Sequence, residues 1–170
     1  MAYVDPNTVT NPTAGQPLPA AFLDVVRDDL EFLVNPPSVS VFNNTTQNVL
    51  DDTLTVLTAN SENFDNDSMH STASNTSRIT INTAGRYVFG ATVQFDPSVT
   101  GHRLLEFYKN ATTRYVISTV PSVSTVNLVI SGTAAVVMAV NDYMEVRVRQ
   151  TSTATRAVTL SEFYAYFLTR

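Results

Sequence analysis

The residues best suited to chemistry lie in one polar run, SENFDNDSMHS, at positions 61–71. Around His70 this run provides the carboxylates and hydroxyls that a serine hydrolase combines, namely Asp65, Asp67, Ser68 and Ser71. Closeness along the chain does not make a catalytic triad, and the sequence contains no G-x-S-x-G nucleophile motif. The second histidine, His102, precedes a predicted strand. We therefore predict that the protein is not an enzyme.

The same run contains three carboxylates, Glu62, Asp65 and Asp67, whose hard oxygen atoms are of the kind that binds Ca²⁺. It lacks the glycine and the terminal bidentate glutamate of an EF-hand loop, so a solvated acidic loop is the better interpretation. The chain has no cysteine, which excludes disulfides, thiolate catalysis and cysteine-ligated zinc. We predict no metal and no cofactor.

Composition and charge limit the classes of molecule that the protein is expected to bind. The chain has 170 residues, a net charge of −5 and a pI of about 4.8, and it shows no basic stripe. These values argue against nucleic acid and against an anionic membrane surface as partners. No apolar run reaches the ~18 residues that a membrane span needs. The polar N-terminus, MAYVDPNTVTNPTAGQ, does not resemble a signal peptide.

Beyond Ser38 the pattern is that of short strands separated by Asn, Asp, Ser, Gly and Pro. The segments expected to form strands are SVSVF, QNVLD, LTVLT, SRITI, GRYVFGATVQF, HRLLEFYKN, TRYVIST, TVNLVIS, AAVVMAV, DYMEVRVRQ and EFYAYFL. No helical pattern alternates with them, which disfavours a parallel α/β fold. The sequence therefore predicts an all-β, antiparallel jelly-roll sandwich over residues 38–170.

Two of these strands have more apolar surface than one sandwich interior requires. In residues 85–95 one face is strongly apolar, consisting of Tyr87, Phe89, Ala91, Val93 and Phe95. In residues 162–168 both faces are apolar, because Phe163, Ala165 and Phe167 alternate with Tyr164, Tyr166 and Leu168. A strand that is apolar on both faces must be covered on both. Another subunit is the simplest cover for the second face.

Residues 1–37 form a separate region. Residues 1–17 read as an extended arm, and residues 19–34 read as a helix that Asn35-Pro36-Pro37 ends. Its apolar positions follow a 3-4-3 spacing, that of the a and d positions of a coiled coil, and they are Leu23, Val26, Leu30 and Leu33. Such a helix either packs as a lid on its own domain, or serves as a docking helix or a short coiled neck between copies.

Three segments, in order, resemble the C1q/TNF-like jelly-roll family. AGRYVFGATVQF resembles that family's aGxYxFxxxV strand, NDYMEVRVRQ its late gDxVxVxV strand, and EFYAYFL its aromatic final strand. Three further segments are similar to virion proteins of tailed phages, namely AAFLDVVRDDLEFLVNPP, FDNDSMHSTASNTSRITINTAGRYV and GHRLLEFYKN. The sequence departs from the family where Asn141 and Ala111 stand in place of the usual turn glycines.

The resemblance implies a homotrimer whose subunits pack through aromatic sheet faces. For this interface we expect Tyr164 and Tyr166, with Tyr87, Phe89, Arg147 and Arg149 as further contacts. The arginines would either face plain solvent or meet carboxylates of a neighbouring copy. Exposed Tyr and Arg side chains at a hairpin tip, namely Tyr108, Arg114 and Tyr115, could stack on sugars.

The resemblance also implies a function. We expect a non-enzymatic phage virion protein, made in the host cytoplasm and exposed on the particle exterior as a capsid decoration or head fibre. Its N-terminal arm and helix would anchor it to other capsid or tail proteins. Two alternatives remain open: a tail appendage that binds a host-surface glycan, and a free C1q/TNF-like ligand-binding module.

Overall fold

The computed structural model describes residue 15, residue 17, residues 20–122 and residues 125–169. The chain divides into two compact units, residues 1–37 and residues 38–170. The predicted N-terminal arm, residues 1–17, lies outside the described residues except for Gly15 and Pro17.

The first unit contains one helix, α1 (Ala20–Val34). Arg27 forms ion pairs with Asp24 at 3.0 Å and with Asp28 at 3.1 Å, which favour the helical backbone modestly. The Asn35 N–H still donates to the Glu31 carbonyl at 2.9 Å, and the prolines that follow cannot continue the helix. Among the described residues, no helix has the length and apolar character needed to span a bilayer.

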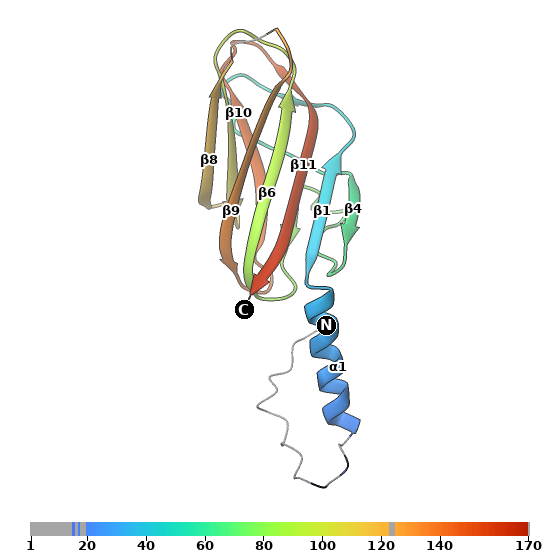
Figure 1. Cartoon of the computed structure of the whole chain (residues 1–170). Helices are drawn as coiled ribbons and strands as arrows, with labels where there is room; N and C mark the ends of the chain where they lie inside the picture. Colours follow the sequence, from blue (N-terminus) through green and yellow to red (C-terminus); the bar gives the residue numbers. More distant parts are fainter. Residues whose placement is uncertain (1–14, 16, 18–19, 123–124, 170) are drawn as a thin grey trace. The chain divides into compact units, whose positions relative to one another are not determined.

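The second unit is built from eleven strands (Figure 1). They are β1 (Ser38–Asn43), β2 (Gln47–Val49), β3 (Thr55–Val56), β4 (Ser61–Asp65), β5 (Arg78–Thr80), β6 (Gly85–Phe95), β7 (His102–Lys109), β8 (Thr113–Pro121), β9 (Leu128–Met138), β10 (Tyr143–Gln150) and β11 (Arg156–Thr169). One sheet, sheet A, has the order β4-β1-β11-β6-β9, with β2 also paired to β11. The other, sheet B, has the order β3-β10-β7-β8, with β5 also paired to β10. The ladders between these strands are antiparallel.

Two strands differ from the sequence-based expectation. β9 is one strand of 11 residues where two were expected, because Gly132 stays in the ladder opposite Ala91 and does not break it. β4 forms inside the run that was expected to be an acidic loop. It pairs with β1, where Phe64 lies opposite Ser40, so tertiary pairing overrides the weak strand propensity of its Asn and Asp residues.

The core lies between the two sheets. On β6 the apolar face predicted from alternation is buried, and Tyr87, Phe89 and Phe95 are each 0% exposed. Phe163 on β11 joins the layers, because its ring centroid lies 6.1 Å from that of Phe89 on β6 and 5.9 Å from that of Phe107 on β7. Burial of a large aromatic side chain is worth about 2–3 kcal/mol, and stacked pairs add roughly 1 kcal/mol.

The two positions where glycine was expected are backbone positions of positive φ. Asn110 and Ala111, with φ of 50° and 59°, turn the hairpin between β7 and β8, and Asn141, with φ of 69°, turns the chain between β9 and β10. An alanine at such an angle carries about 1 kcal/mol of strain, whereas asparagine tolerates it better. The departures from the family pattern therefore leave the turns in place.

Asp142 ties these two turns together. Its carboxylate oxygens lie 2.6 Å from Lys109 Nζ, 2.7 Å from Asn110 Nδ2 and 2.8 Å from the Ala139 backbone nitrogen. Burial by itself raises the pKa of Asp142, but the hydrogen bonds from Lys109, Asn110 and Ala139 outweigh it and hold the pKa at about 2. The ionised carboxylate is thus part of the folded structure.

We expect Phe163→Ala to lower the free energy of unfolding by about 3–4 kcal/mol, because it removes the ring that contacts both sheets and leaves a cavity. Urea unfolding at fixed protein concentration measures this change. Tyr115→Ala is the matched control: its ring is 43% exposed, and the loss should stay near ~0.5 kcal/mol. Equal losses for the two variants would contradict the role given to Phe163.

We expect Asp142→Asn to lower the free energy of unfolding by about 2 kcal/mol at neutral pH. The folded pKa of about 2 lies below the ordinary value of 3.8, so the stabilisation is fully present above about pH 4 and is lost as the pH falls toward 2. The difference between wild type and variant should therefore shrink over that range. Asp52→Asn, whose side chain is 68% exposed, should show no such convergence.

Candidate functional site

The outer face of sheet A carries an apolar surface that stays open to solvent among the described residues. On β11 the outward residues after Glu162 are Tyr164, Tyr166 and Leu168, and the neighbouring strands extend the surface in register. Tyr166 lies opposite Val88 of β6, which in turn lies opposite Ala135 of β9. We call this surface the aromatic face, and its members are Phe64, Val88, Ala135, Val137, Tyr164, Tyr166 and Leu168.

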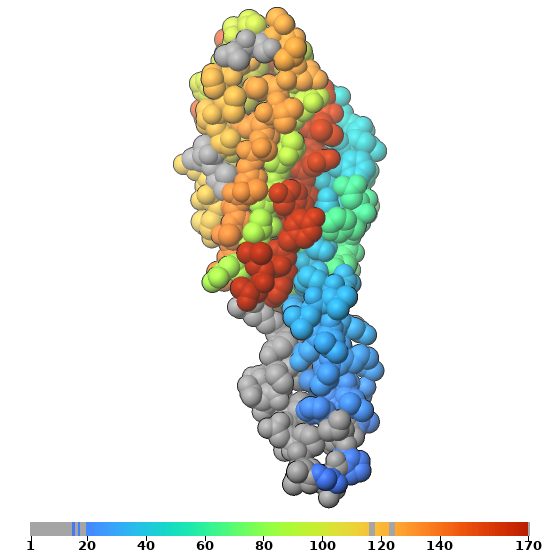
Figure 2. Space-filling view, viewed as in Figure 1, coloured from blue at the N-terminus to red at the C-terminus, as the bar shows by residue number. Residues whose placement is uncertain are grey.

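The rings of the aromatic face form a continuous row. Tyr166 lies between Tyr164 and Phe64, with ring centroids 5.5 Å and 6.1 Å away. Tyr164 lies flat across β6 over Gly90, where an added Cβ would be 2.1 Å from the ring carbon Cζ. Gly90 is therefore the position that lets the tyrosine lie down on the sheet. In Figure 2 the red side chains of β11 run along the middle of this face, beside the green side chains of β6.

The exposed fractions on this face are high for such side chains. Phe64 is 41% exposed, Tyr166 44%, Leu168 52% and Val137 66%. Contiguous apolar patches of this kind on a folded domain mark interaction surfaces.

The outer face of sheet B is polar and internally paired. Arg147 Nη2 lies 2.7 Å from Glu145 Oε2, and the Arg147 guanidinium lies 4.3 Å from the ring centroid of Tyr108. The Tyr108 hydroxyl donates to Glu106 at 3.0 Å, and Arg114 lies 3.4 Å from the same carboxylate. Burial, and then the hydrogen bond to Glu106, raise the pKa of Tyr108. Both glutamates are buried, and their partners satisfy them within the chain.

Comparison with solved structures supports the same architecture. The globular domain of zebrafish complement 1qA protein matches with a TM-score of 0.59 and 18% sequence identity, over 79% of this chain and 98% of that one. The chain has a C1q/TNF-like jelly-roll fold. No protein-family model matches the sequence. No curated protein matches it either.

Two of the residues predicted for the subunit interface are instead buried inside the domain. Tyr87 and Phe89 are each 0% exposed and point into the sandwich, where Tyr87 packs edge-on against Phe167 at 5.4 Å. The apolar face of β6 forms part of the core, because sheet B covers it. Neither side chain can contact a neighbouring copy while the sandwich is intact.

Arg147 and Arg149 also do not join the aromatic face. They lie on β10, on the outer side of sheet B, so the six expected interface residues do not form one surface. Arg147 is paired with Glu145, and Arg149 Nε lies 3.3 Å from Asp52 Oδ1. Their carboxylate partners are in the same chain rather than in a neighbour. Tyr164 and Tyr166 are the expected residues that the structure places on an open surface, and their role in an interface stays a prediction.

The residues around His70 form a folded loop without catalytic geometry. His70 Nδ1 lies 2.8 Å from Glu62 Oε1, and Nε2 lies 3.3 Å from the Thr76 carbonyl. Asp65 accepts hydrogen bonds from three backbone N–H groups, those of Asp67, Met69 and His70. The Ser71 hydroxyl accepts two backbone N–H groups of its own loop. Within the described part of the chain, no three His, Cys, Asp or Glu side chains are grouped as metal ligands.

The apolar seam of α1 is exposed along its length. Leu23 is 51% exposed, Val26 40%, Leu30 55% and Leu33 74%, and no residue of the helix is buried. An amphipathic helix of 15 residues with an open seam is marginal alone and gains stability from a partner.

The sequence did not identify four members of the aromatic face, and they are Phe64, Val88, Ala135 and Val137. Phe64 stood in a run judged to be a loop, so its outward direction could not be read. Val137 lay in a predicted strand, AAVVMAV, but alternation alone does not say which of two apolar faces points outward. The structure also revises the prediction that three hairpin residues contact sugars. Tyr108 and Arg114 belong to the paired network on sheet B, whereas Tyr115 is exposed.

Proposed function

We propose that the protein is a homotrimeric assembly module of C1q/TNF-like fold, held together by the aromatic face of sheet A. The observation that carries this proposal is the row Phe64, Tyr166 and Tyr164, a partly exposed aromatic strip that runs from the edge strand β4 to the central strand β11. A monomer would leave the exposed part of this strip in water, where each large side chain forgoes about 1 kcal/mol of further burial. Packing around a threefold axis covers it.

The strip lies on the outer face of sheet A, and this position is consistent with three copies arranged in closed symmetry. A surface that meets a different surface of the next copy forms a ring when the rotation closes. The exposed seam of α1 supports association of copies, because helices tethered to an oligomer are held at high effective concentration and can pair where one helix would not. The trimer and the helix thereby stabilise each other.

We further propose that this module is a non-enzymatic structural protein of a phage virion, exposed as a capsid decoration or head fibre. The support is the similarity of residues 20–37, 64–88 and 101–110 to virion proteins of tailed phages, together with the absence of cysteine in the chain. The open helix seam would dock on another virion protein. The protein would then stabilise the particle by bridging neighbouring subunits.

Replacing both Tyr164 and Tyr166 by Ser should convert the trimer into a soluble monomer, because the substitutions remove the centre of the aromatic strip without touching the core. Light scattering measures the solution mass, which should fall from about three times the protomer mass of 18.6 kDa to that mass itself. Tyr115→Ser, at a comparably exposed tyrosine on sheet B, should remain trimeric.

Gly90→Ala offers a gentler change at the same place. The added methyl group displaces the far end of the flexible Tyr164 ring and leaves the backbone as it is, so it should weaken the trimer while preserving the fold. If the variant with both tyrosines replaced is still a trimer, the aromatic face is not the subunit interface.

A chain that starts at Ser38 tests which unit drives assembly. Since residues 38–170 form a compact unit, we expect this shorter chain to remain trimeric by light scattering, and only the full chain to bind virion particles that lack the protein. A truncated chain that is a monomer would make the helix the oligomerising element. Equal binding of both chains to the particles would remove the anchoring role of the N-terminal segment.

A further inference from the structure

Arg103 is a buried cation at the end of the sandwich where β6 ends and β11 begins. It is 0% exposed and points inward from β7, with its guanidinium carbon 5.5 Å from the ring centroid of Phe95. Nη1 donates to the carbonyls of His102 at 3.2 Å and Thr100 at 3.4 Å. Nε and Nη2 have no hydrogen-bond partner among the described residues.

Among the described residues, no carboxylate forms an ion pair with Arg103. The nearby Asp96 is already engaged, since its Oδ2 lies 3.6 Å from Arg156 Nη1 and its Oδ1 accepts the Ala157 N–H at 3.1 Å. Two guanidinium groups thus share one carboxylate, which leaves a local charge of about +1. Burial, and then the repulsion from Arg156, lower the pKa of Arg103. A buried charge with orphan donors is costly unless something outside the chain compensates it.

An open cavity of about 290 Å³ lies beside these arginines. Its lining residues are Pro97, Ser98, Val99, Thr100, Thr125 and Arg156. Thr100 connects the cavity to Arg103, because it lines the cavity while its carbonyl holds Nη1. The volume suits a ligand of about monosaccharide size, near the lower limit of small-molecule sites.

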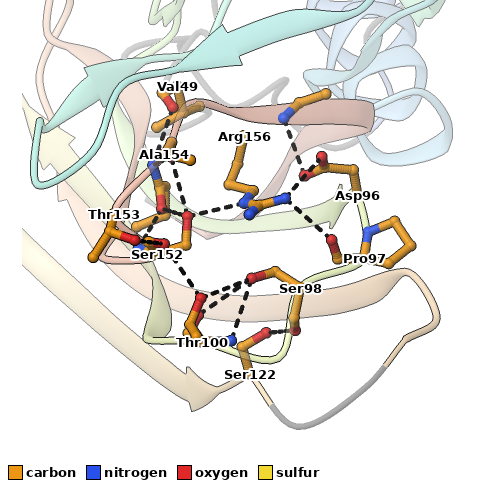
Figure 3. Close-up of polar contacts among 12 residues, drawn as sticks. Val49, Asp96, Pro97, Ser98, Thr100, Ser122, Ser152, Thr153, Ala154 and Arg156 are labelled. Carbon is orange, nitrogen blue, oxygen red and sulfur yellow. Dashed lines mark hydrogen bonds and ion pairs between the residues drawn. The ribbon is translucent and has the colours of Figure 1, made fainter.

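The walls of the cavity are held in place by hydrogen bonds (Figure 3). Arg156 donates from Nε to Ser152 Oγ at 2.9 Å and from Nη1 to the Pro97 carbonyl at 3.3 Å. Thr100 Oγ1 donates to the Ser152 carbonyl at 3.2 Å, and the Ser122 hydroxyl donates to the Ser98 carbonyl.

Gly101 allows the loop to lie this close to its neighbour. Its φ is +72°, and an added Cβ would be 1.8 Å from the Thr151 carbonyl oxygen. The loop at residues 96–101 is therefore fixed against β7 and the segment after β10. A ligand would meet a surface that is already formed, which lowers the entropic cost of binding.

We propose that this cavity binds an oxyanion, held by Arg156 and by the hydroxyls of Ser98 and Thr100, which turn from their acceptors within the chain to donate to the ion, with Arg103 supplying positive charge from behind. The oxyanion is either a free inorganic ion or the acidic group of a saccharide. The cavity lies at the opposite end of β11 from Tyr166, which pairs with Ser38, where the N-terminal segment joins the domain. The site does not depend on the trimer or on a virion role.

The test uses the full chain in a chloride buffer of constant ionic strength. Phosphate, sulfate and glucuronate are titrated, with glucose as the neutral control, and binding is followed by NMR chemical shifts and by thermal unfolding. We expect saturable binding of anions and none of glucose. Tighter binding of glucuronate would identify an acidic saccharide, and tighter binding of phosphate or sulfate would identify a free ion.

Arg103→Met should lose affinity by roughly tenfold or more, because the field behind the cavity disappears. Without anions its melting temperature should equal or exceed that of wild type, because a buried unpaired charge is replaced by an apolar side chain. Arg149→Met, at an arginine on the outer face of sheet B, should bind as wild type does. Thr100→Val, which keeps the backbone carbonyl, should also weaken binding.

The proposal is overturned if wild type shows no saturable shift, or if Arg103→Met and wild type bind anions equally. Should Arg103→Met not fold, Thr100→Val decides between these outcomes. The solution mass of each variant is measured in parallel. A monomeric wild type that binds anions would leave this site standing while the trimer proposal fails.

Discussion

The two apolar faces of β11 are the constraint on which the rest of the structure depends. Side chains on a strand alternate strictly, so Phe163 and Ala165 can enter the core only if Tyr164 and Tyr166 face outward. β11 also pairs with β1, β2 and β6, so it organises sheet A as well as the core. A shift of one residue in its register would exchange the two sets and expose Phe163. The aromatic face is therefore a consequence of the strand that builds the core.

The buried charged groups of this domain fall into two clusters that differ in how completely they are hydrogen-bonded. On the outer face of sheet B, Glu106 and Glu145 are buried but satisfied by Arg114, Arg147 and Tyr108, which is a structural use of charge. At the end of the sandwich, Arg103 is buried with two donor atoms free among the described residues. Because a satisfied network only supports the fold, whereas an unsatisfied cation calls for an external partner, these two clusters have different functional meanings.

Assembly and ligand binding would occupy separate parts of the molecule. The aromatic face covers the outer side of sheet A, and the cavity lies among loops at the end where β11 begins. The proposed anchor joins the domain at Ser38, at the other end of that strand. The cavity and the point where the N-terminal segment joins the chain thus lie at opposite ends of β11. This division is consistent with a module that is built into a larger particle and still meets a soluble partner.

The sequence by itself determined the class of fold, the helix and its apolar seam, and the alternation of each main strand. It also determined the two turns in which Ala111 and Asn141 replace the usual glycines. These properties are local, since alternation and turn preference are written in neighbouring residues. Only the tertiary structure decided which apolar face is buried. It put Tyr87 and Phe89 in the core, placed Arg147 and Arg149 on the opposite sheet, and added Phe64 to the aromatic face. It also brought Arg103 and Arg156 together, because proximity between strands depends on sheet order, which no local pattern encodes.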